Sequence, residues 1–541
     1  MPTKKKLSRR EFFKNVAIGA AAVAGAGALR ATPTQAQTAC PLPGVPTKWD
    51  YETDVIVVGY GGAGTFAAIA AAEAGANVII LEKAPEGGGS TRMSGANFTV
   101  TNDPANAAKY FFVASGLVTP MEQCQAWAQE IAKTTAWFDK YNIKWTARPE
   151  TFGPDFRNFP GANAIRSIVI TGLGPALYSQ TDAIVKANKN IQVMLKTPST
   201  ALVQNPATRE ILGVLADSGG KSIAVKAKRG VVLSAGGFEY NETMVNNYLR
   251  PVPLKSVGWK YNTGDAILMA QAIGADLWHM NMIASCGLAT ITPGTDIGWK
   301  RPNAKSGNNV IVDRFGSRFI CENPEPGGAH REWMYFEIWD WSQTQKDSGY
   351  RVIPSYIVFD ETARMAGPVC DLATGSSTGN IKLPKELGGA PDGWSKDNSV
   401  EIAKGWIKKG NTIEELAKAI GEDVEADVLK ATIEKYNGYV KTGKDLDFNR
   451  NPKSLAPVEK PPFYALKVWP GIFNTCGGPR KNEKAQVLDT KQKVIRRLYA
   501  AGSISHSAAH LYSTFGQNLA ENFAFGNVAG RNVASEKPWD V

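Results

Sequence analysis

The chain has 541 residues, of which 43% are hydrophobic and 21% charged. This composition is typical of a globular protein, and the length is enough for two or three domains with a large buried core. The formal net charge of +11 falls to +5 without residues 1–36, which hold seven basic residues and one glutamate. Because no Lys/Arg tract is interleaved with aromatic residues, we expect no nucleic acid partner.

The N-terminal segment has the features of an export signal. The sequence SRREFFK at residues 8–14 precedes a weakly apolar, Ala/Gly-rich run from Val16 to Leu29, and small residues at Thr34 and Ala36 suit cleavage after Ala36. The run is shorter than the roughly 20 residues of a membrane-spanning helix. We therefore predict a twin-arginine (Tat) signal peptide at residues 1–36, export to the periplasm with a cofactor already bound, and no stable membrane insertion.

Neither the cysteines nor the histidines form a metal-binding pattern. The six cysteines show no CxxC, CxxCH or ferredoxin-like spacing, and the four histidines include no HExxH motif. We therefore expect no metal site, haem or iron–sulfur cluster on this chain. The spacings identify no disulfide pair.

A nucleotide-binding motif follows the N-terminal segment. A predicted strand at Asp54–Val58 leads into GYGGAG at residues 59–64 and then into an alanine-rich helix at Thr65–Ala74. The glycines allow a tight turn, a close approach of the backbone to a pyrophosphate, and close packing of the helix on the strand. The helix N-terminus supplies partial positive charge for the phosphates.

A second predicted strand, Asn77–Leu81, ends at an acidic residue 18 positions after the last glycine of this motif. An acid at about this distance binds the ribose hydroxyls of a dinucleotide. The predicted cofactor contacts of this region are Gly59, Gly61, Gly62, Ala63, Gly64, Glu82 and Lys83.

Further glycine-rich and strand segments extend the pattern along the chain: EGGGSTRMSGAN at 86–97, TALV at 200–203, a hairpin at 211–226, SAGGF at 234–238, TGD at 263–265, LYAAGS at 498–503, and a helix with NLAE at 518–521 and FGNVAG at 525–530. In this order they resemble the flavoproteins grouped with fumarate reductase and 3-ketosteroid Δ1-dehydrogenase. The resemblance covers nearly the whole chain after the signal peptide.

This resemblance implies an α/β fold. We expect a Rossmann-like FAD-binding domain, with a parallel sheet plus a β-meander, and an inserted α+β substrate cap domain. The implied boundaries are 1–36 for the signal peptide, 50–282 and 466–541 for the FAD-binding domain, and 283–465 for the cap. A capping box at Thr412 and Glu415 predicts one helix of the cap, and a second helix is predicted from Val424 to Tyr436.

The resemblance also implies FAD contacts beyond the first motif. In this family the second glycine-rich loop runs beside the flavin, and N–H groups of the last helix meet its pyrimidine end, where they would stabilise negative charge on the reduced ring. Residues 90–94 contain no histidine for covalent attachment, so we expect FAD to be bound non-covalently. The implied contacts are Gly89, Ser90, Thr91, Ser94, Gly95, Ala201, Ala235, Gly236, Asp265, Gly502, Ser503, Asn518 and Leu519.

Three positions depart from the fumarate reductase pattern. The segment RFICE at 318–322 matches the family's RFxxE, but the position of the proton-donating arginine is Pro326. Asn474 occupies the place of a substrate-binding histidine, and Ser513 that of a carboxylate-binding arginine. Without two cationic groups a small dicarboxylate would be held poorly, so we do not expect a standard fumarate reductase.

The ketosteroid dehydrogenase branch matches in part. Tyr512 and Gly516 have the spacing of the tyrosine and glycine that polarise the substrate ketone in that branch, whereas its catalytic base would fall at Pro326. Other polar groups near this loop could protonate carbon or polarise a carbonyl. The candidate catalytic residues are therefore Tyr512, Gly516, His510, His506 and Arg331, with Gln517 and His330 beside them.

These features predict an oxidoreductase that transfers hydride between FAD N5 and a carbon–carbon bond conjugated to a carbonyl or carboxylate. Reduction of an enoate or enone is expected over desaturation, with Tyr512 as acid or carbonyl polariser. Because NAD(P)H is scarce in the periplasm, we expect a cytochrome c or quinol-linked electron partner. The alternative is a flavin-binding electron carrier or sensor without catalysis, which the substituted positions would also fit.

Overall fold

The computed structural model describes residues 44–540, except 292–297, 301–305, 324–340, 345–346, 371, 374–392, 422 and 508–510. The predicted signal peptide lies outside these residues. Among the described residues, no helix combines the length and the apolar character needed to cross a membrane.

The first sheet is built around five parallel strands in the order β23-β9-β1-β2-β6. Their bounds are β1 (Tyr51–Val58), β2 (Val78–Leu81), β6 (Ile191–Met194), β9 (Lys221–Leu233) and β23 (Val494–Ala500). A meander of β7 (Ser199–Gln204) and β8 (Ile211–Ser218) joins β9 by antiparallel pairs, and β22 (Gln486–Leu488) pairs antiparallel with β23. The predicted parallel sheet with a β-meander is therefore confirmed.

Both faces of this sheet are buried. Along β1, Val55 and Val57 belong to one hydrophobic core and Ile56 and Val58 to another. Because successive side chains of a strand point to opposite faces, a sheet covered on both sides needs the continuous β-branched run that this sequence provides.

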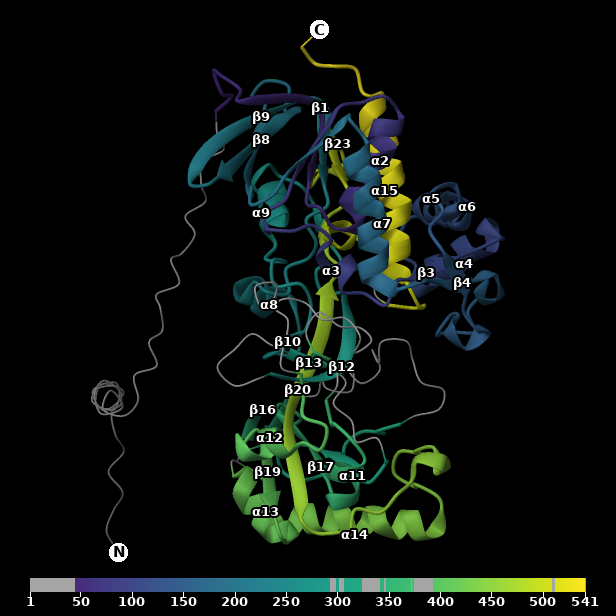
Figure 1. Ribbon diagram of the computed structural model, residues 1–541, viewed down its shortest axis with the longest axis vertical. Helices are drawn as coiled ribbons and strands as arrows, with labels where there is room; N and C mark the ends of the chain where they lie inside the picture. Colours follow the sequence, from purple (N-terminus) through teal and green to yellow (C-terminus); the bar gives the residue numbers. More distant parts are fainter. Residues whose placement is uncertain are drawn as a thin grey trace, which may run out of the picture. The chain divides into compact units, whose positions relative to one another are not determined.

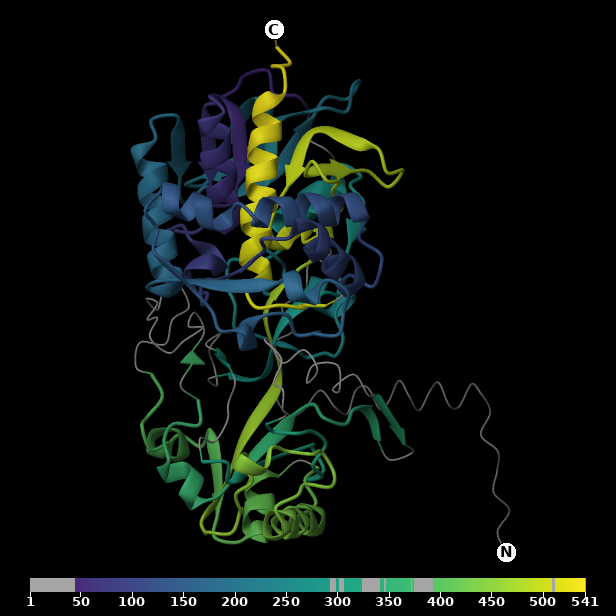
Figure 2. The same ribbon diagram turned by 90° about the vertical axis from the view of Figure 1, so that its right-hand side faces the viewer.

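Two helices cover one face of the first sheet together. Helix α2 (Gly62–Glu73) follows β1, and α15 (Gln517–Ser535) packs along it although the two are far apart in sequence (Figure 1, Figure 2). Glycines make this close approach possible, because a Cβ at Gly530 would lie 2.3 Å from the backbone oxygen of Ala67. Between β2 and β6 the chain forms α3 (Gly89–Arg92), α4 (Pro104–Ala114), α5 (Met121–Ile131), α6 (Thr134–Lys140), α7 (Leu173–Ala187) and a small sheet of β3 (Asn97–Val100), β5 (Arg166–Ile170) and β4 (Trp145–Ala147).

A second sheet is formed mainly by the segment between the two parts of the first. Its central strand, β20 (Phe463–Thr475), is 13 residues long and runs as one continuous arrow in Figure 1. The order is β14-β17-β20-β12-β13-β18, with β10 and β19 also paired to β20. The bounds are β10 (Lys255–Ser256), β12 (Ile283–Ile291), β13 (Gly298–Lys300), β14 (Asn309–Val312), β17 (Ser355–Phe359), β18 (Leu372–Ala373) and β19 (Ile407–Gly410).

The helices beside the second sheet include those expected from the sequence. The Thr412 side chain accepts the N–H of Glu415 at 3.1 Å and caps α13 (Ile413–Ile420), as the capping box predicted. Helix α14 spans Ala426–Thr442 and so runs six residues past its predicted end. The other short elements are α8 (Glu242–Tyr248), α9 (Asp265–Ala272), α11 (Glu361–Met365), α12 (Ser399–Ala403), and the strand pairs β11 (Leu277–Trp278) with β21 (Gly478–Pro479) and β15 (Trp341–Thr344) with β16 (Asp347–Tyr350).

Candidate active site

A cavity that is open to solvent lies where β1, β2 and β9 end and α2 begins. This is the carboxyl edge of the parallel strands, where open α/β sheets bind their ligands. Many of the predicted cofactor contacts line it: Gly59, Gly61, Gly62, Ala63, Glu82, Lys83, Gly89, Ser90, Thr91, Ala235, Gly236, Asp265 and Ser503.

The glycine turn before α2 has the geometry of a pyrophosphate site. Gly59 has φ +101°, and a Cβ there would lie 2.7 Å from the backbone oxygen of Ser234, so only glycine fits without a shift. A Cβ at Gly61 would meet no protein atom within 4 Å, which leaves the backbone open to a ligand. Helix α2 begins at Gly62 without a side-chain cap. The helix N-terminus therefore suits the phosphates of a dinucleotide.

Glu82 stands at the end of β2, with its carboxylate held by backbone groups. Oε2 accepts the N–H of Tyr60 at 2.8 Å and Oε1 accepts that of Ala84 at 2.7 Å. Burial raises the pKa of Glu82. The neighbouring Lys83 forms an ion pair with Asp265 at 2.5 Å, which joins two predicted contacts across the cavity. These charged and polar side chains fit the ribose and adenosine part of FAD.

The other predicted cofactor contacts do not line the cavity. They are Gly64, Ser94, Gly95, Ala201, Gly502, Asn518 and Leu519. Gly64 packs beneath the glycine turn, because a Cβ there would lie 2.0 Å from the oxygen of Gly59. Gly502, with φ +84°, packs in the same way against Ala63. Asn518 and Leu519 form the first turn of α15.

Several lining residues were not predicted from the sequence: Val58, Leu81, Ser199, Ser234, Trp259, Tyr261, Asn262, Ala266, Met269 and Asn522. Two signals could have found some of them. Tyr261 and Asn262 directly precede the TGD segment at 263–265. Asn522 is four residues after Asn518 and so lies on the same helix face; its Nδ2 donates to Thr91 at 3.4 Å.

The loop before α15 brings Tyr512 and Gly516 to the start of that helix. Tyr512 is buried, and its hydroxyl oxygen accepts the backbone N–H of Asn518 at 3.3 Å. Gly516 is the N-cap residue in a left-handed conformation, and a Cβ there would lie 2.4 Å from the oxygen of Asn97. A hydroxyl held at a helix N-terminus is a suitable hydrogen-bond donor for a substrate carbonyl.

A chain of polar side chains connects this loop to the cavity. Asn518 Nδ2 donates to Asn474 Oδ1 at 2.9 Å, and Asn474 Nδ2 donates to Ser503 Oγ at 3.3 Å. Ser503 lines the cavity. Asn474, which the sequence pattern aligns with a substrate-binding histidine of fumarate reductases, therefore makes neutral amide contacts with the first turn of α15.

The remaining candidates are placed differently. His506 is buried, and its backbone oxygen accepts from Nδ1 of His279 at 3.0 Å. Ser513 bonds through its N–H and hydroxyl to Gln517 Oε1, and its carbonyl accepts from the Tyr110 hydroxyl at 2.5 Å. The structure thus gives Ser513 a role in holding the loop. His510, His330, Arg331 and Pro326 lie outside the described residues.

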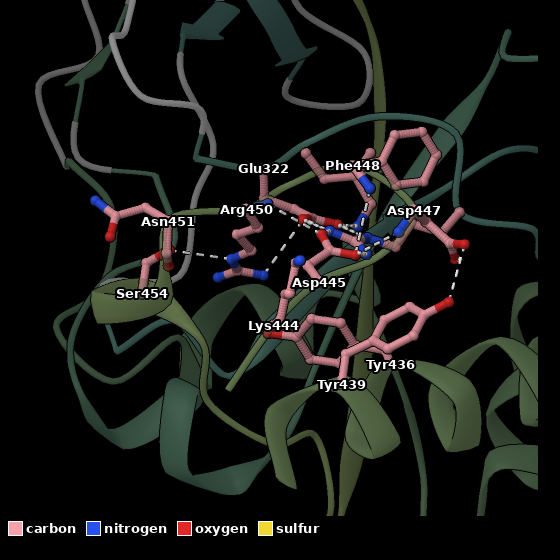
Figure 3. A network of polar contacts seen from close by, with 12 residues as sticks. Glu322, Tyr436, Tyr439, Lys444, Asp445, Asp447, Phe448, Arg450, Asn451 and Ser454 are labelled. Atoms are coloured by element: carbon pink, nitrogen blue, oxygen red, sulfur yellow. Dashed lines mark hydrogen bonds and ion pairs between the residues drawn. The ribbon is translucent and has the colours of Figure 1, made fainter. Parts of the chain in front are cut away.

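The RFxxE segment forms part of a buried ion-pair network. Arg318 contacts Glu322 and Asp445, each at 2.7 Å, and its side chain is 4% exposed. Figure 3 shows Glu322 and Asp445 with Arg450, which contacts Glu322 at 3.3 Å and donates to two backbone oxygens. Each of these four side chains bonds to at least one of the others, and we interpret the segment as a structural network within the second sheet and its helices.

Comparisons with known proteins agree with this geometry. The FAD binding domain family matches residues 54–519. Urocanate reductase from Eggerthella lenta is 30% identical, with 91% of this chain and 76% of the relative covered. The 3-oxosteroid 1-dehydrogenase of Mycolicibacterium smegmatis is 26% identical over 90% of this chain and 97% of its own.

Solved structures share the fold. The 3-ketosteroid Δ1-dehydrogenase from Sterolibacterium denitrificans superposes with a TM-score of 0.74 at 23% identity, covering 90% of this chain and 99% of its own. The open conformation of a flavocytochrome c3 fumarate reductase gives 0.64 at 24% identity, covering 98% and 82%. The chain therefore belongs to the flavoprotein superfamily of fumarate reductase and 3-ketosteroid dehydrogenase, and it is an FAD-dependent oxidoreductase that acts on CH–CH groups.

Proposed function

We propose that this enzyme reduces a carbon–carbon double bond conjugated to a carbonyl or carboxylate, with Tyr512 as acid or carbonyl polariser. When bound in the cavity, FAD would supply the hydride. The observation that carries the proposal is the placement of the Tyr512 hydroxyl at the N-terminus of α15, next to a polar chain that reaches the cavity. Gly516, His506, His510 and Arg331 stay candidates for assisting groups.

The chemistry of the Tyr512 hydroxyl supports this role. Because its oxygen accepts the N–H of Asn518, its own proton is directed away from that nitrogen. The partial positive charge at the helix N-terminus favours charge that develops on the phenol oxygen as it donates. A hydroxyl in this position can protonate the carbon next to the one that receives hydride, or stabilise an enolate oxygen.

The relatives support the substrate class. They include reductases of urocanate and digoxin and dehydrogenases of 3-oxosteroids. Asn474 and Ser513, at positions where fumarate reductases bind carboxylates, are neutral here and bonded to α15. A substrate with at most one carboxylate, or with a neutral carbonyl, suits such a site better than a dicarboxylate.

The cellular setting and the domain limits belong to the same proposal. Residues 1–36 are a Tat signal, and the enzyme works in the periplasm with a cytochrome c or quinol-linked electron donor. The FAD-binding domain comprises residues 50–282 and 466–541, and the cap comprises 283–465. The arginine pair, apolar run and cleavage site support the signal.

FAD is proposed to be bound non-covalently. Among the described residues that line the cavity there is no histidine or cysteine to form a covalent link. Purified protein should therefore be yellow and should release FAD, not FMN, into the supernatant on acid precipitation. Flavin that stays with the denatured chain would contradict this assignment.

Tyr512→Phe tests the catalytic role. The variant keeps the ring and removes the hydroxyl, so FAD content and folding should be unchanged while kcat falls by about 10² or more, since the lost interaction acts in the transition state. Turnover is measured with whichever acrylate, aryl-acrylate or enone reoxidises the reduced wild-type enzyme fastest.

Tyr110→Phe is the matched control, because it removes a buried hydroxyl that bonds to the same loop at the Ser513 oxygen. It should lower the thermal midpoint while kcat stays close to that of wild type. If Tyr512→Phe turned over like wild type, Tyr512 would not be the acid. If no such acceptor reoxidised the wild-type protein, a non-catalytic electron carrier or sensor would be favoured.

A further inference from the structure

Glu239 is a buried carboxylate just beyond the end of β9, and the proposed mechanism leaves it unused. The residue is 5% exposed. Its Oε1 accepts from Nδ2 of Asn262 at 2.6 Å, and its Oε2 accepts from both the N–H and the hydroxyl of Thr475 at 3.2 Å. Both carboxylate oxygens therefore act as acceptors, for donors from two different segments.

The partner Asn262 links this carboxylate to the cavity wall. Its Nδ2 also donates to Ser90 Oγ at 3.1 Å, so the two hydrogens of the amide go to two different oxygens. Asn262 and Ser90 both line the cavity. The side-chain amide of Asn262 cannot be flipped, because its oxygen would then face the carboxylate oxygen of Glu239.

The orientation of Asn262 sets the role of Ser90. A serine hydroxyl has one proton and two lone pairs. Because Ser90 Oγ accepts from Asn262, its own proton is directed away from that nitrogen. Since Ser90 lines the cavity, its hydroxyl can then donate to a ligand there. We propose that Glu239 is a positioning residue that, through Asn262, fixes Ser90 as a hydrogen-bond donor to FAD.

Only a carboxylate satisfies both partners of Glu239. A glutamine has one oxygen and one NH₂ group. If its oxygen faced Asn262, its NH₂ would face the Thr475 N–H, and in the opposite orientation two NH₂ groups would meet. Burial raises the pKa of Glu239 to about 7, so the double acceptor is present at pH 8. The inference rests on FAD occupying the cavity and is independent of Tyr512.

The test measures FAD release from the purified holoenzyme at pH 8, by flavin fluorescence on dilution, for Ser90→Ala, Glu239→Gln and the double variant. Each single change should weaken FAD binding about 2- to 10-fold, as loss of one hydrogen bond does. Since Glu239 acts through Ser90, the double variant should bind FAD no more weakly than whichever single variant has the lower FAD affinity.

Glu401→Gln is the matched control. Glu401 is 2% exposed and accepts from Ser395 N–H at 3.0 Å, but neither Glu401 nor Ser395 lines the cavity, so its loss should leave FAD affinity unchanged. Glu239→Asp, which keeps the charge and shortens the side chain, replaces Glu239→Gln if that variant does not fold.

Two outcomes overturn the inference. One is a Ser90→Ala variant that binds FAD like wild type. The other is a double variant whose loss is the product of the two single losses, which would show that Glu239 acts independently of Ser90. Wild-type protein that purified without FAD would instead refute the proposed cofactor site itself, so the two failures are distinguishable.

Discussion

Buried carboxylates beside the cavity are paired with neutral donors. Glu82 accepts two backbone N–H groups, and Glu239 accepts from an asparagine, a threonine hydroxyl and a backbone N–H. Neutral donors offset only part of the cost of burying a charge, so burial raises the pKa of both residues. Each carboxylate thus fixes nearby backbone at some cost in stability when it is ionised.

Glu239 imposes a pH dependence on the stability of the protein. Its pKa is about 7 in the folded protein, against 4.5 as the ordinary value. Between these values the folded state binds the proton and the unfolded state does not, so the Glu239 contribution to stability falls as pH rises from about 4.5 to about 7, by about 3 kcal/mol. The thermal midpoint of wild type relative to Glu239→Gln should therefore be higher at pH 5 than at pH 8.

Glu414→Gln serves as the control for this measurement. Its hydrogen bond to Lys430 lowers the pKa of Glu414 to about 2, so this carboxylate is ionised in both states between pH 5 and pH 8. The midpoint of that variant relative to wild type should not change over this range. An equally flat difference for Glu239→Gln would refute the raised pKa.

The sequence predicted those site residues whose role depends on local backbone geometry. Gly59 needs a positive φ and Gly61 needs open space, and both requirements follow from a strand–turn–helix motif. Asn262 and Glu239 could not be predicted in the same way, because their contacts are not local. Asn262 bonds to Glu239, 23 residues away, and to Ser90, 172 residues away. Asparagine has no pattern in the sequence that distinguishes such a link from an ordinary turn.

At the scale of secondary structure, the first two turns of α15 organise the site. Gln517 and Asn518 bond to the preceding loop and to Asn474, while Glu521 and Asn522 lie one turn further along. Glu521 forms a fully buried ion pair with Lys481 at 2.5 Å and accepts from Ser507. Side chains at i and i+4 share a helix face, so α15 holds the loop that precedes it at two points, Ser507 and Ser513.

Further along, α15 depends on glycine for its contact with α2. A Cβ at Gly526 would lie 2.8 Å from the Ala63 oxygen, and one at Gly530 would lie 2.3 Å from the Ala67 oxygen. Gly526→Ala and Gly530→Ala should each destabilise the protein by about 1–3 kcal/mol through overpacking, with the larger effect at Gly530. The thermal midpoint of the holoenzyme measures this.

Gly438→Ala in α14 provides the matched control, because a Cβ there would meet nothing within 4 Å. Alanine is favoured over glycine inside a helix, so this variant should be more stable by about 0.5–1 kcal/mol. If Gly530→Ala were also stabilising, the close helix contact would be wrong. The sequence placed glycines in this helix, but it could not show that they face α2, since the two helices are joined only by the fold.

In the whole molecule, each of the two large sheets has a different hydrophobic core on either face, and one core of the first sheet also includes Ile283 and Ile472 of the second. Ile357 and Val358, adjacent on β17, belong to different cores, as do Val57 and Val58 on β1. The β-branched run of β1 predicts a strand from the sequence. The strands of the second sheet were not predicted one by one, because they carry no motif and pair mostly over long sequence distances. The network of Figure 3 places buried charged residues in this second region.

This organisation predicts that stability and FAD binding can be changed separately. Arg318→Met removes one charge from the buried network and leaves Glu322 and Asp445 without their principal cation. Breaking a buried pair in this way costs about 3–5 kcal/mol. The thermal midpoint should fall clearly, while FAD affinity of the folded protein, measured below the transition, should stay within about twofold of wild type.

Lys430→Met is the control for Arg318→Met, because Lys430 forms an ion pair with Glu414 at 2.7 Å in which both side chains are about half exposed. Solvent screens such a pair, so its loss should change the midpoint little. Arg318 does not line the cavity of the candidate active site. If Arg318→Met weakened FAD binding well beyond this twofold range, the RFxxE segment would be coupled to the cofactor site. Its assignment as a structural network would then be wrong.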